Sequence, residues 1–342
     1  MNAAARLQYY RRVLPAYFGS GGSQLTFWHE TPEINPRAHI AAQAKSRPLG
    51  PYYMSFREKA DYSGPHDANG IPMLDYRGAI GLQYNPIAIA QWGLANYNRF
   101  SEDAKDAEDA KDARLQRTLN AADWLAANLE QNAHGLWVWH HHFDWEYRET
   151  LKAPWYSGLA QGQGVSLLLR AHAQTGDGKY RQAASDAFVS LTTPIAQGGV
   201  LFEDNEKNLW IEEYLVDPPT HILNGFIWAL WGVFDFSLAH ADASAKQIAK
   251  HIFDRGVQTL LHNLARFDTG YWSLYEQSGT QLKMLASPFY HRLHIVQLRV
   301  MANLTGDRRF AGVADRWEGY TQRRANRSRA LVEKSIFKLL HY

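Results

Sequence analysis

From Gly81 onward, apolar positions recur with helical spacing, and similar segments return along the chain. The segments "YNPIAIAQ" (84–91) and "YHRLHIVQ" (290–297) share a Tyr, an Ile five residues later and a Gln seven residues later. "YSGLAQGQ" (156–163) keeps the Tyr and the Gln, and "HILNGFIWALWG" (221–232) begins a fourth segment. The pattern predicts a helical hairpin that is repeated four times.

A second repeated pattern marks the ends of the predicted helices. "QTGDGKYRQAASDAF" (174–188) resembles "LTGDRRFAGVADRW" (304–317). In each, we expect the Gly to close one helix in the left-handed conformation and the Asp to cap the next helix.

Short aromatic runs bounded by glycine separate the hairpins: "GLWVWHHHFDW", "GGVLFED" and "GYWSLYEQSG". Their alternation predicts β-hairpins or strands, each placed before the first helix of a unit. The first helices carry small residues, as crowded inner helices need: Gly158, Gly162, Gly164, Gly225 and Gly232. Hairpins in series make either an open solenoid or a closed ring, and these two features favour the ring.

The predicted fold is therefore mainly α. We expect an incomplete (α/α) toroid of helical hairpins with short β-hairpin inserts gathered at one end. Residues 1–80 are rich in turns and form a small irregular or β-containing lead segment that packs on the toroid, and residues 81–342 form the toroid itself, the catalytic domain. The inserts would surround a cleft at that end.

Composition narrows the class of protein only slightly. The 12 Trp and 18 Tyr suit sugar stacking, although core packing is the better interpretation for most of them. A net charge of +2 argues against a general polyanion binder, while a local basic patch can serve an acidic substrate. The absence of cysteine excludes disulfides and Cys-bound metal. The N-terminal "MNAAARLQYYRRVL" lacks a signal-peptide core and no stretch is apolar enough to span a bilayer, so we expect a cytoplasmic protein without a membrane partner.

One helical stripe combines Tyr290, His294, Gln297 and Met301. Because Gln297 matches the glutamines of the other repeats, we interpret it as a residue that ties helices together. Tyr290 lies in the first turn, where a side chain can reach the mouth of the cleft. The histidines are open to three roles: tuning that tyrosine, holding a substrate carboxylate, or bonding the next helix.

Two further segments carry candidate acid/base groups. In "WIEEYLVDPP" (210–219), two carboxylates precede Tyr214, which is either a proton-transfer site or an incidental loop. "GYWSLYEQSG" supplies Tyr275. Tyrosines around one cleft suit proton transfer at a carbon next to a carboxylate, provided that cations such as His291, Arg292 or His294 lower a phenol's pKa.

Other chemistries receive little support from the sequence. In "HHH" (140–142), strand geometry lets at most two rings converge, so we predict no metal site. A glycine-rich phosphate loop, a GxSxG elbow and a basic run for nucleic acid are all absent from the sequence, so we predict no cofactor and no nucleic-acid partner.

At these residues the chain resembles the D-glucuronyl C5-epimerase family, whose members convert glucuronic to iduronic acid units in heparosan-type chains. The resemblance covers roughly residues 80–320 and rests on "LQYNPIAIAQWGLANY" (82–97), "SGLAQGQGVSLLLRAH" (157–172), "WIEEY" with "HILNGFIWALWGVFDF" (210–236), and "YHRLHIVQL" with "RWEGY" (290–320), in the family's order. It implies a toroid, and it implies catalytic roles for Glu213, Tyr214, Tyr275 and Tyr290.

The resemblance also implies a cofactor-independent isomerase that acts on an acidic polysaccharide, heparosan or a related uronan, with a homodimer left open. The residues predicted to bind substrate are His291, His294, Arg292, Asn224, Tyr156, Gln161, Tyr84 and Trp210. Two features depart from the animal members: Glu276-Gln277-Ser278 replaces an Asp-Leu-Arg-His run, and a lead segment of about 80 residues leaves no room for the β-rich domain that precedes the toroid in those members.

Three alternatives stay open at this point. A polysaccharide lyase would remove the same proton and then eliminate the linked sugar. A glycoside hydrolase would need two carboxylates across the cleft, for which Glu213 with Asp144 or Glu276 is the only loose candidate. A non-catalytic binder of acidic glycans would lose nothing when Tyr290 is replaced by Phe.

Overall fold

The computed structural model describes residues 27–28, 30–41, 49–102, 108–279 and 282–341. The N-terminal stretch that lacks a signal-peptide core therefore lies outside the described residues. By its internal contacts, the chain divides into two compact units. The large unit consists of Asn35–His221 and Gly225–Leu260. The small unit consists of the described residues up to Ile34, of Ile222–Asn224, and of the described residues from Leu261 onward.

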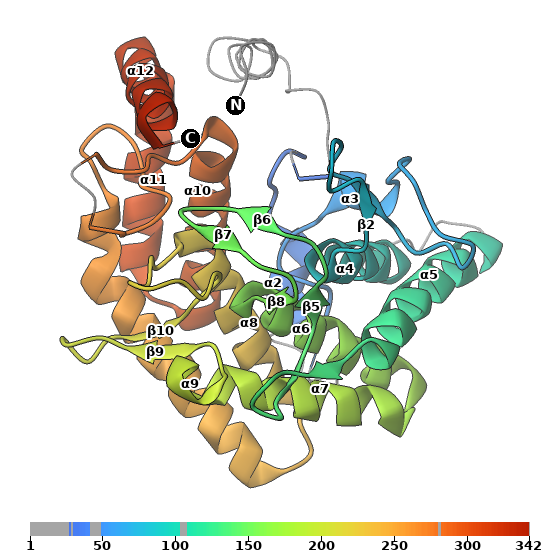
Figure 1. The fold of residues 1–342 in the computed structure, drawn as a ribbon. Helices are drawn as coiled ribbons and strands as arrows, with labels where there is room; N and C mark the ends of the chain where they lie inside the picture. Colours follow the sequence, from blue (N-terminus) through green and yellow to red (C-terminus); the bar gives the residue numbers. More distant parts are fainter. Residues whose placement is uncertain (1–26, 29, 42–48, 103–107, 280–281, 342) are drawn as a thin grey trace. The chain divides into compact units, whose positions relative to one another are not determined.

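Three helical hairpins form the large unit (Figure 1). They consist of α4 (Pro86–Glu102) with α5 (Glu108–Ala127), α6 (Gly158–Thr175) with α7 (Gly178–Thr192), and α8 (Leu223–Ala239) with α9 (Ala243–Asn263). The first two residues of α8 and the last three residues of α9 belong to the small unit.

The first helices of these hairpins pack closely on one another. Gln91 Nε2 of α4 donates to Gln163 Oε1 of α6 over 3.0 Å. A Cβ atom at Gly162 of α6 would lie 2.5 Å from the Cα of Ala229 in α8, so only glycine permits this approach. The predicted inner helices and the predicted role of the repeated glutamines are thereby confirmed in this unit.

Short strands and turns connect the helices. The antiparallel pairs are β1 (Leu74–Asp75) with β2 (Leu82–Gln83), β3 (Glu130–Gln131) with β4 (Trp137–Val138), β5 (His140–His141) with β8 (Trp155–Tyr156), β6 (Trp145–Glu146) with β7 (Thr150–Leu151), and β9 (Leu201–Glu203) with β10 (Leu209–Ile211). Short helices are α2 (Pro36–Ala41), α3 (Arg57–Ala60) and the 3-10 turns Ile195–Gln197 and Leu264–Phe267. Two of the three aromatic runs thus form hairpins, while "GYWSLYEQSG" makes only isolated bridges with its neighbours.

The described part of the predicted lead segment packs on the helices of the large unit. The Tyr52 amide donates to Asn98 Oδ1 over 2.6 Å, and the Tyr53 hydroxyl donates to Asp235 Oδ1 over 2.6 Å. Arg170 Nη1 of α6 lies 2.6 Å from Asp235 Oδ2, and both side chains are buried. Removing one member of such a buried pair costs about 3–5 kcal/mol. The predicted boundary at residue 80 stays a prediction.

The small unit contains the fourth hairpin, α10 (Pro288–Thr305) with α11 (Arg308–Gln322), followed by α12 (Arg324–His341). Gly306 ends α10 with φ +72°, and Asp307 caps α11 by accepting from the Arg309 amide over 2.9 Å. In the large unit, Gly176 and Asp177 do the same between α6 and α7. The predicted stop-and-start signal is confirmed at both places.

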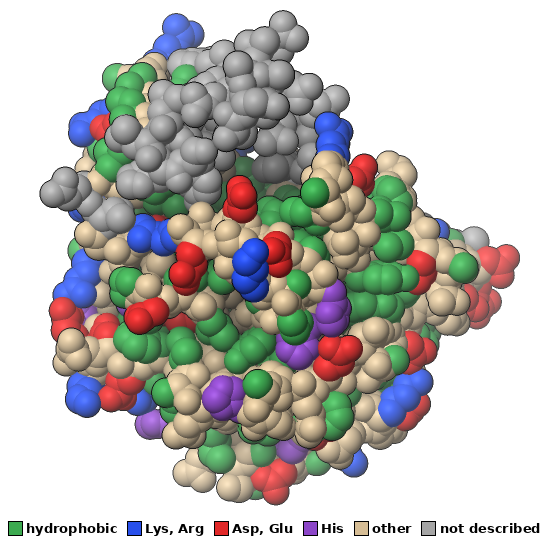
Figure 2. All heavy atoms as spheres, viewed as in Figure 1, with side chains coloured by type: hydrophobic (Ala, Val, Ile, Leu, Met, Phe, Trp, Pro, Cys, Tyr) green, Lys and Arg blue, Asp and Glu red, His purple; other side chains and the backbone are tan. Residues whose placement is uncertain are grey.

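These elements confirm the mainly α prediction, with helical hairpins in series and short β-hairpin inserts of the (α/α) toroid class. On the face shown in Figure 2, acidic and basic side chains are interspersed, in keeping with the small net charge of +2. Among the described helices, none has the length and apolar character that crossing a membrane requires.

Candidate functional site

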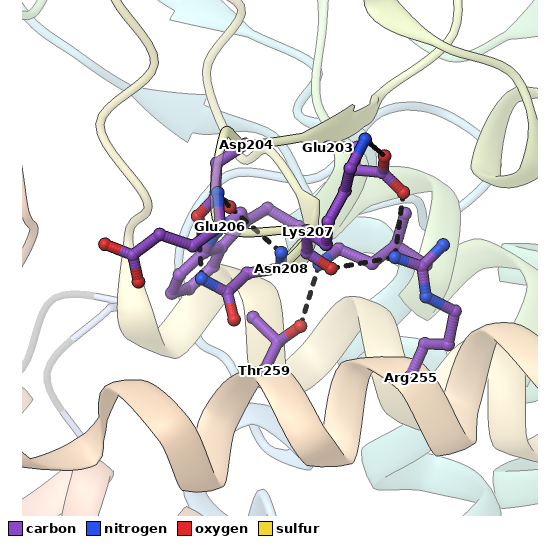
Figure 3. Close-up of polar contacts among 9 residues, drawn as sticks. Glu203, Asp204, Glu206, Lys207, Asn208, Arg255 and Thr259 are labelled. Carbon is purple, nitrogen blue, oxygen red and sulfur yellow. Dashed lines mark hydrogen bonds and ion pairs between the residues drawn. The ribbon is translucent and has the colours of Figure 1, made fainter.

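The β9–β10 hairpin of the large unit leads into the Glu-Glu-Tyr segment, and α9 holds this hairpin in place (Figure 3). Arg255 Nη2 donates to Glu203 Oε2 over 2.8 Å, and Thr259 Oγ1 accepts from the Leu209 amide over 2.8 Å. Beyond β10, the Gly158 amide at the start of α6 donates to the Glu212 carbonyl over 3.0 Å. The backbone that carries the candidate residues is therefore fixed on two sides.

Glu213 directs its carboxylate at the first turn of α8. The side chain is 4% exposed, and a Cβ atom at Gly225 would lie 2.1 Å from its Oε2. Gly225 thus leaves the space that this carboxylate occupies. The amide dipoles at the start of a helix favour a negative charge there.

Tyr214 follows directly and is half-buried. Its ring centroid lies 4.7 Å from that of Tyr147 and 5.7 Å from that of Trp155. The Tyr147 hydroxyl donates to Thr220 Oγ1 over 3.1 Å. Aromatic neighbours on two sides fix the plane of the Tyr214 ring, which a proton-transfer group requires.

Tyr275 and Tyr290 lie together in the small unit. Their ring centroids are 4.9 Å apart with an edge-to-face angle of 66°. Tyr290 occupies the first turn of α10, where its amide donates to the capping hydroxyl of Ser287 over 3.3 Å. Tyr275 is 7% exposed, and its amide and carbonyl bond Met284 and Leu223. The predicted pair of phenols is thus adjacent.

His291 and His294 are buried in the core of the small unit. Ser273 Oγ lies 2.7 Å from His291 Nδ1 and 3.0 Å from His294 Nδ1, and His291 Nε2 donates to the Trp317 carbonyl over 3.0 Å. Burial lowers the pKa of His291 to about 4 and the pKa of His294 well below its ordinary value. Of the three roles left open by the sequence, these contacts fit bonding between elements, because neutral rings supply no cation to a phenol.

Three other residues of the small unit, Asn224, Glu276 and Arg292, are also candidates for the site from the sequence. Asn224 is buried, and its carbonyl accepts from Gln297 Nε2 over 2.9 Å, which confirms that Gln297 ties helices together. Arg292 is exposed on α10. Glu276, next to Tyr275, is buried, and desolvation raises its carboxyl pKa to about 7. A carboxyl group that titrates near neutral pH is a candidate acid/base group.

The remaining predicted substrate contacts lie in the large unit. Trp210 is buried, and its Nε1 donates to Asp204 Oδ2 over 3.1 Å, so its ring packs within the protein. The hydroxyls of Tyr84 and Tyr156 donate to Asp67 Oδ2 and to the Gly198 carbonyl, and burial raises the pKa of both phenols. Gln161 is buried, and neither amide atom has a partner among the described residues. Their substrate-binding roles stay predictions.

The histidine run divides as strand geometry predicts. His140 Nδ1 and His142 Nε2 lie 3.1 Å and 3.5 Å from Glu130 Oε2. His141 points the other way, stacks on Trp155 with centroids 3.8 Å apart, and has its pKa lowered to about 3 by burial. Among the described residues, no group of three or more side chains is arranged to hold a metal ion.

Sequence reasoning missed several neighbours of the candidate residues. Tyr147 and Trp155 contact Tyr214 from β-hairpin segments far away in the chain, and no local pattern links them to it. His221 bonds Glu212 across a loop. The sequence suggests Glu276 only as a loose hydrolase candidate; its place beside Tyr275 is the available signal, and its burial is not visible in the sequence.

A family model described as "D-glucuronyl C5-epimerase C-terminus" matches residues 131–319, which is more than half of the chain. The match defines a family of carbohydrate epimerase domains, and Glu213, Tyr214, Tyr275 and Tyr290 lie within the matched residues. This chain belongs to the D-glucuronyl C5-epimerase C-terminal family.

Individual relatives match over part of their length. The chain is 34% identical over 212 residues to a D-glucuronyl C5-epimerase of Caenorhabditis elegans, covering 58% of this chain and 34% of that protein. It is 27% identical over 202 residues to an uncharacterized protein of Methanocaldococcus jannaschii, covering 58% of this chain and 63% of that one. The chain therefore spans less than two thirds of both relatives.

Among solved structures, an unsaturated glucuronyl hydrolase from Bacillus sp. GL1 is similar with a TM-score of 0.44 and 14% identity. The match covers 68% of this chain and 61% of that one.

Proposed function

We propose that this chain is a uronate C5-epimerase, an isomerase that converts D-glucuronic acid to L-iduronic acid units within a heparosan-type polysaccharide. The observation that carries the proposal is the family match over residues 131–319, within which Glu213, Tyr214, Tyr275 and Tyr290 all fall. The adjacency of Tyr275 and Tyr290 and the fixed setting of Glu213 and Tyr214 support it further.

The reaction needs two proton carriers and a means of stabilising charge. The C5 hydrogen lies next to the carboxylate, so its removal leaves an enolate-like anion. One of the phenols of Tyr214, Tyr275 and Tyr290 removes this proton as phenolate, and another returns a proton to the opposite face of the sugar. Glu213 orients or activates a phenol. Such general acid–base groups each contribute about 10²–10⁴-fold to the rate.

The negative charge that develops on the substrate carboxylate calls for hydrogen-bond donors. Gln161 suits this role because its amide is without a partner among the described residues. Asn224, Arg292, Tyr84 and Tyr156 complete the proposed substrate contacts. With His291, His294 and Trp210 buried and bonded, we assign to these three the support of the residues around them.

The natural partner in this proposal is an acidic polysaccharide, and the proposed site of action is the cytoplasm. The proposed reaction moves protons between groups of the chain and the substrate and calls for no cofactor. Assembly as a homodimer is left to measurement.

The decisive experiment incubates the protein with N-deacetylated or N-sulfated heparosan in D₂O and follows the product by NMR. Deuterium at C5 together with iduronate signals is the expected result. A lack of exchange on every uronan tested would sink the proposal. An unsaturated uronate, visible by its ultraviolet absorbance, would point to the lyase instead.

Within the hydrolase alternative, Asp144 is unsuited to the role of the general acid. A glycosidase acid needs a raised pKa, but the hydrogen bonds from Lys152 and from the Ala153 amide hold the Asp144 pKa below its ordinary value, and the side chain is exposed. The second candidate, Glu276, does have a raised pKa, so reducing-end analysis of the incubated polymer remains a useful control.

A further inference from the structure

One side-chain pair closes the loop that carries the Glu213-Tyr214 segment. Glu212 stands at the end of β10 and His221 just before α8. Glu212 Oε1 lies 2.5 Å from His221 Nδ1, and Oε2 accepts from the His221 amide over 3.1 Å. Both oxygens of a carboxylate that is 1% exposed are thus engaged by one residue at the opposite end of the loop.

The backbone of His221 has an energetically unfavourable conformation. Its φ is +52°, in the left-handed region that residues with a Cβ atom rarely adopt. Such conformations persist when the surroundings determine them, and they cluster at functional sites. Here the surroundings are the two bonds to Glu212 and the ring of Trp210, which stacks on the imidazole with centroids 4.2 Å apart.

A second set of contacts, through Tyr147, also holds the loop in place. Thr220, next to His221, accepts from the Tyr147 hydroxyl, and the Tyr147 ring packs against Tyr214. Displacing His221 would therefore move Thr220 and loosen the aromatic contact that fixes the Tyr214 ring. Trp210 in turn is bonded to Asp204 in the β9–β10 turn, so the base of the loop is anchored to the hairpin.

We infer that the Glu212–His221 pair is a clasp that positions Glu213 and Tyr214 by joining the two ends of the loop that bears them. The inference rests on the proposed function for its effect on catalysis. His221 acts through Tyr214 and is a positioning residue. It is also distinct from the substrate contacts proposed above, because its Nδ1 and amide are both directed at Glu212.

The test compares three variants of the whole chain. His221→Ala removes the clasp. His221→Asn is the conservative variant, because asparagine tolerates the left-handed backbone and its side-chain amide can donate to Glu212 from the place of Nδ1. His142→Ala is the control, since that side chain is 63% exposed and follows β5, outside the loop under test. The readouts are kcat and KM for epimerisation and hydrogen exchange of the amides of residues 213–221.

We expect the His221→Ala variant to lose about tenfold or more in kcat with KM changed less than about twofold, because misplacing a reacting group costs rate more than binding. The loop amides should exchange about tenfold faster. The Asn variant should recover most of both quantities, and the control should match the parent protein. If the Ala variant does not fold, Glu212→Gln replaces it beside His221→Asn.

Unchanged kcat and unchanged exchange in the Ala variant would overturn the inference. A raised KM with unchanged loop exchange would overturn it as well, because it would make His221 a substrate contact. If the parent protein shows no epimerisation on any uronan, the proposed function fails separately, and the exchange measurement alone decides whether the clasp exists.

Discussion

Tyr290 and Tyr214 are candidates for the same kind of chemistry, yet the protein holds them in different ways. Tyr290 sits in the first turn of a regular helix, where local capping by Ser287 fixes its backbone. Tyr214 lies on an irregular loop whose shape depends on contacts from distant parts of the chain, namely Tyr147, Trp155 and the Glu212–His221 pair.

The difference teaches where each residue is vulnerable. A helix supports Tyr290 through many equivalent bonds, so the loss of one contact costs little. The loop supports Tyr214 through side-chain contacts with distant segments, among them Tyr147 and Trp155. We therefore expect substitutions around Tyr214 to affect catalysis at a distance, whereas those around Tyr290 should act mainly on stability.

The largest effect should come from the phenols themselves. Replacing either Tyr214 or Tyr290 by Phe removes a proton carrier while keeping the ring, so we expect epimerisation to fall by about 10²–10⁴-fold with little change in the unfolding midpoint. NMR detection of C5 deuteration measures this. Tyr180→Phe, which loses the bond of the phenol hydroxyl to Asp123, serves as the control. Full activity in both the Tyr214→Phe and the Tyr290→Phe variants would contradict the proposed tyrosine mechanism.

The next effect concerns the carboxyl beside Tyr275. Burial raises the Glu276 pKa from 4.5 to about 7, so the folded protein holds this proton more tightly than the unfolded chain. The stabilisation is complete below about pH 4.5 and is lost as the pH rises through about 7, a change of about 3 kcal/mol. Relative to the parent protein, Glu276→Gln should therefore gain stability between pH 5 and pH 8.

Denaturant unfolding of both proteins at these two pH values measures the difference. The exposed Glu206→Gln variant provides the comparison, and its stability relative to the parent should not change with pH in this way. A constant difference between Glu276→Gln and the parent at both pH values would mean that the Glu276 carboxyl titrates normally.

A smaller effect should follow from filling the space beside Glu213. In Gly225→Ala, the new methyl group would lie 2.1 Å from Glu213 Oε2, so the carboxylate must move. Overpacking of this kind costs about 1–3 kcal/mol, and we expect a loss in kcat that exceeds the loss in stability. Steady-state kinetics together with thermal unfolding test this. Gly312→Ala, at an unobstructed helical position, should leave kcat unchanged and raise the stability by up to about 1 kcal/mol.

The smallest effect should be at the cap of α10. Ser287→Ala removes the hydroxyl that accepts from the Tyr290 amide, which costs about 1 kcal/mol of stability. Activity at a temperature well below unfolding should stay within about twofold of the parent. A large loss of kcat in this variant would erase the contrast between the two tyrosines.

The parts of the structure that could be predicted are those written in local sequence. Gly176 with Asp177 and Gly306 with Asp307 mark helix ends because the left-handed conformation and the N-cap each favour one residue type. The repeated glutamines revealed bonds between helices because the repeat placed them at equivalent points. The place of Tyr275 in the segment before α10 and of Tyr290 in the first turn of that helix put both phenols at one predicted cleft, and the family resemblance implied catalytic roles for them.

What escaped prediction depends on burial and on contacts between distant segments. Trp210 is predicted to contact substrate, and the sequence does not show its burial, its bond to Asp204 or its stacking on His221. The sequence left three roles open for His291 and His294, and it could not choose among them because the burial that lowers their pKa values is not visible in it. The pairing of Glu212 with His221 requires a left-handed backbone at a non-glycine residue. No sequence pattern predicts this conformation at His221.

The buried, hydrogen-bonded ring of His291 can serve as an NMR probe. Its Nε2 proton is held by the Trp317 carbonyl, and the ring is stacked on Trp272 with centroids 3.9 Å apart. An imidazole proton in such a place exchanges with water only when its surroundings open, so it should give a slowly exchanging, downfield resonance in water. That single line would report the opening of the small unit in the intact protein, without any added label.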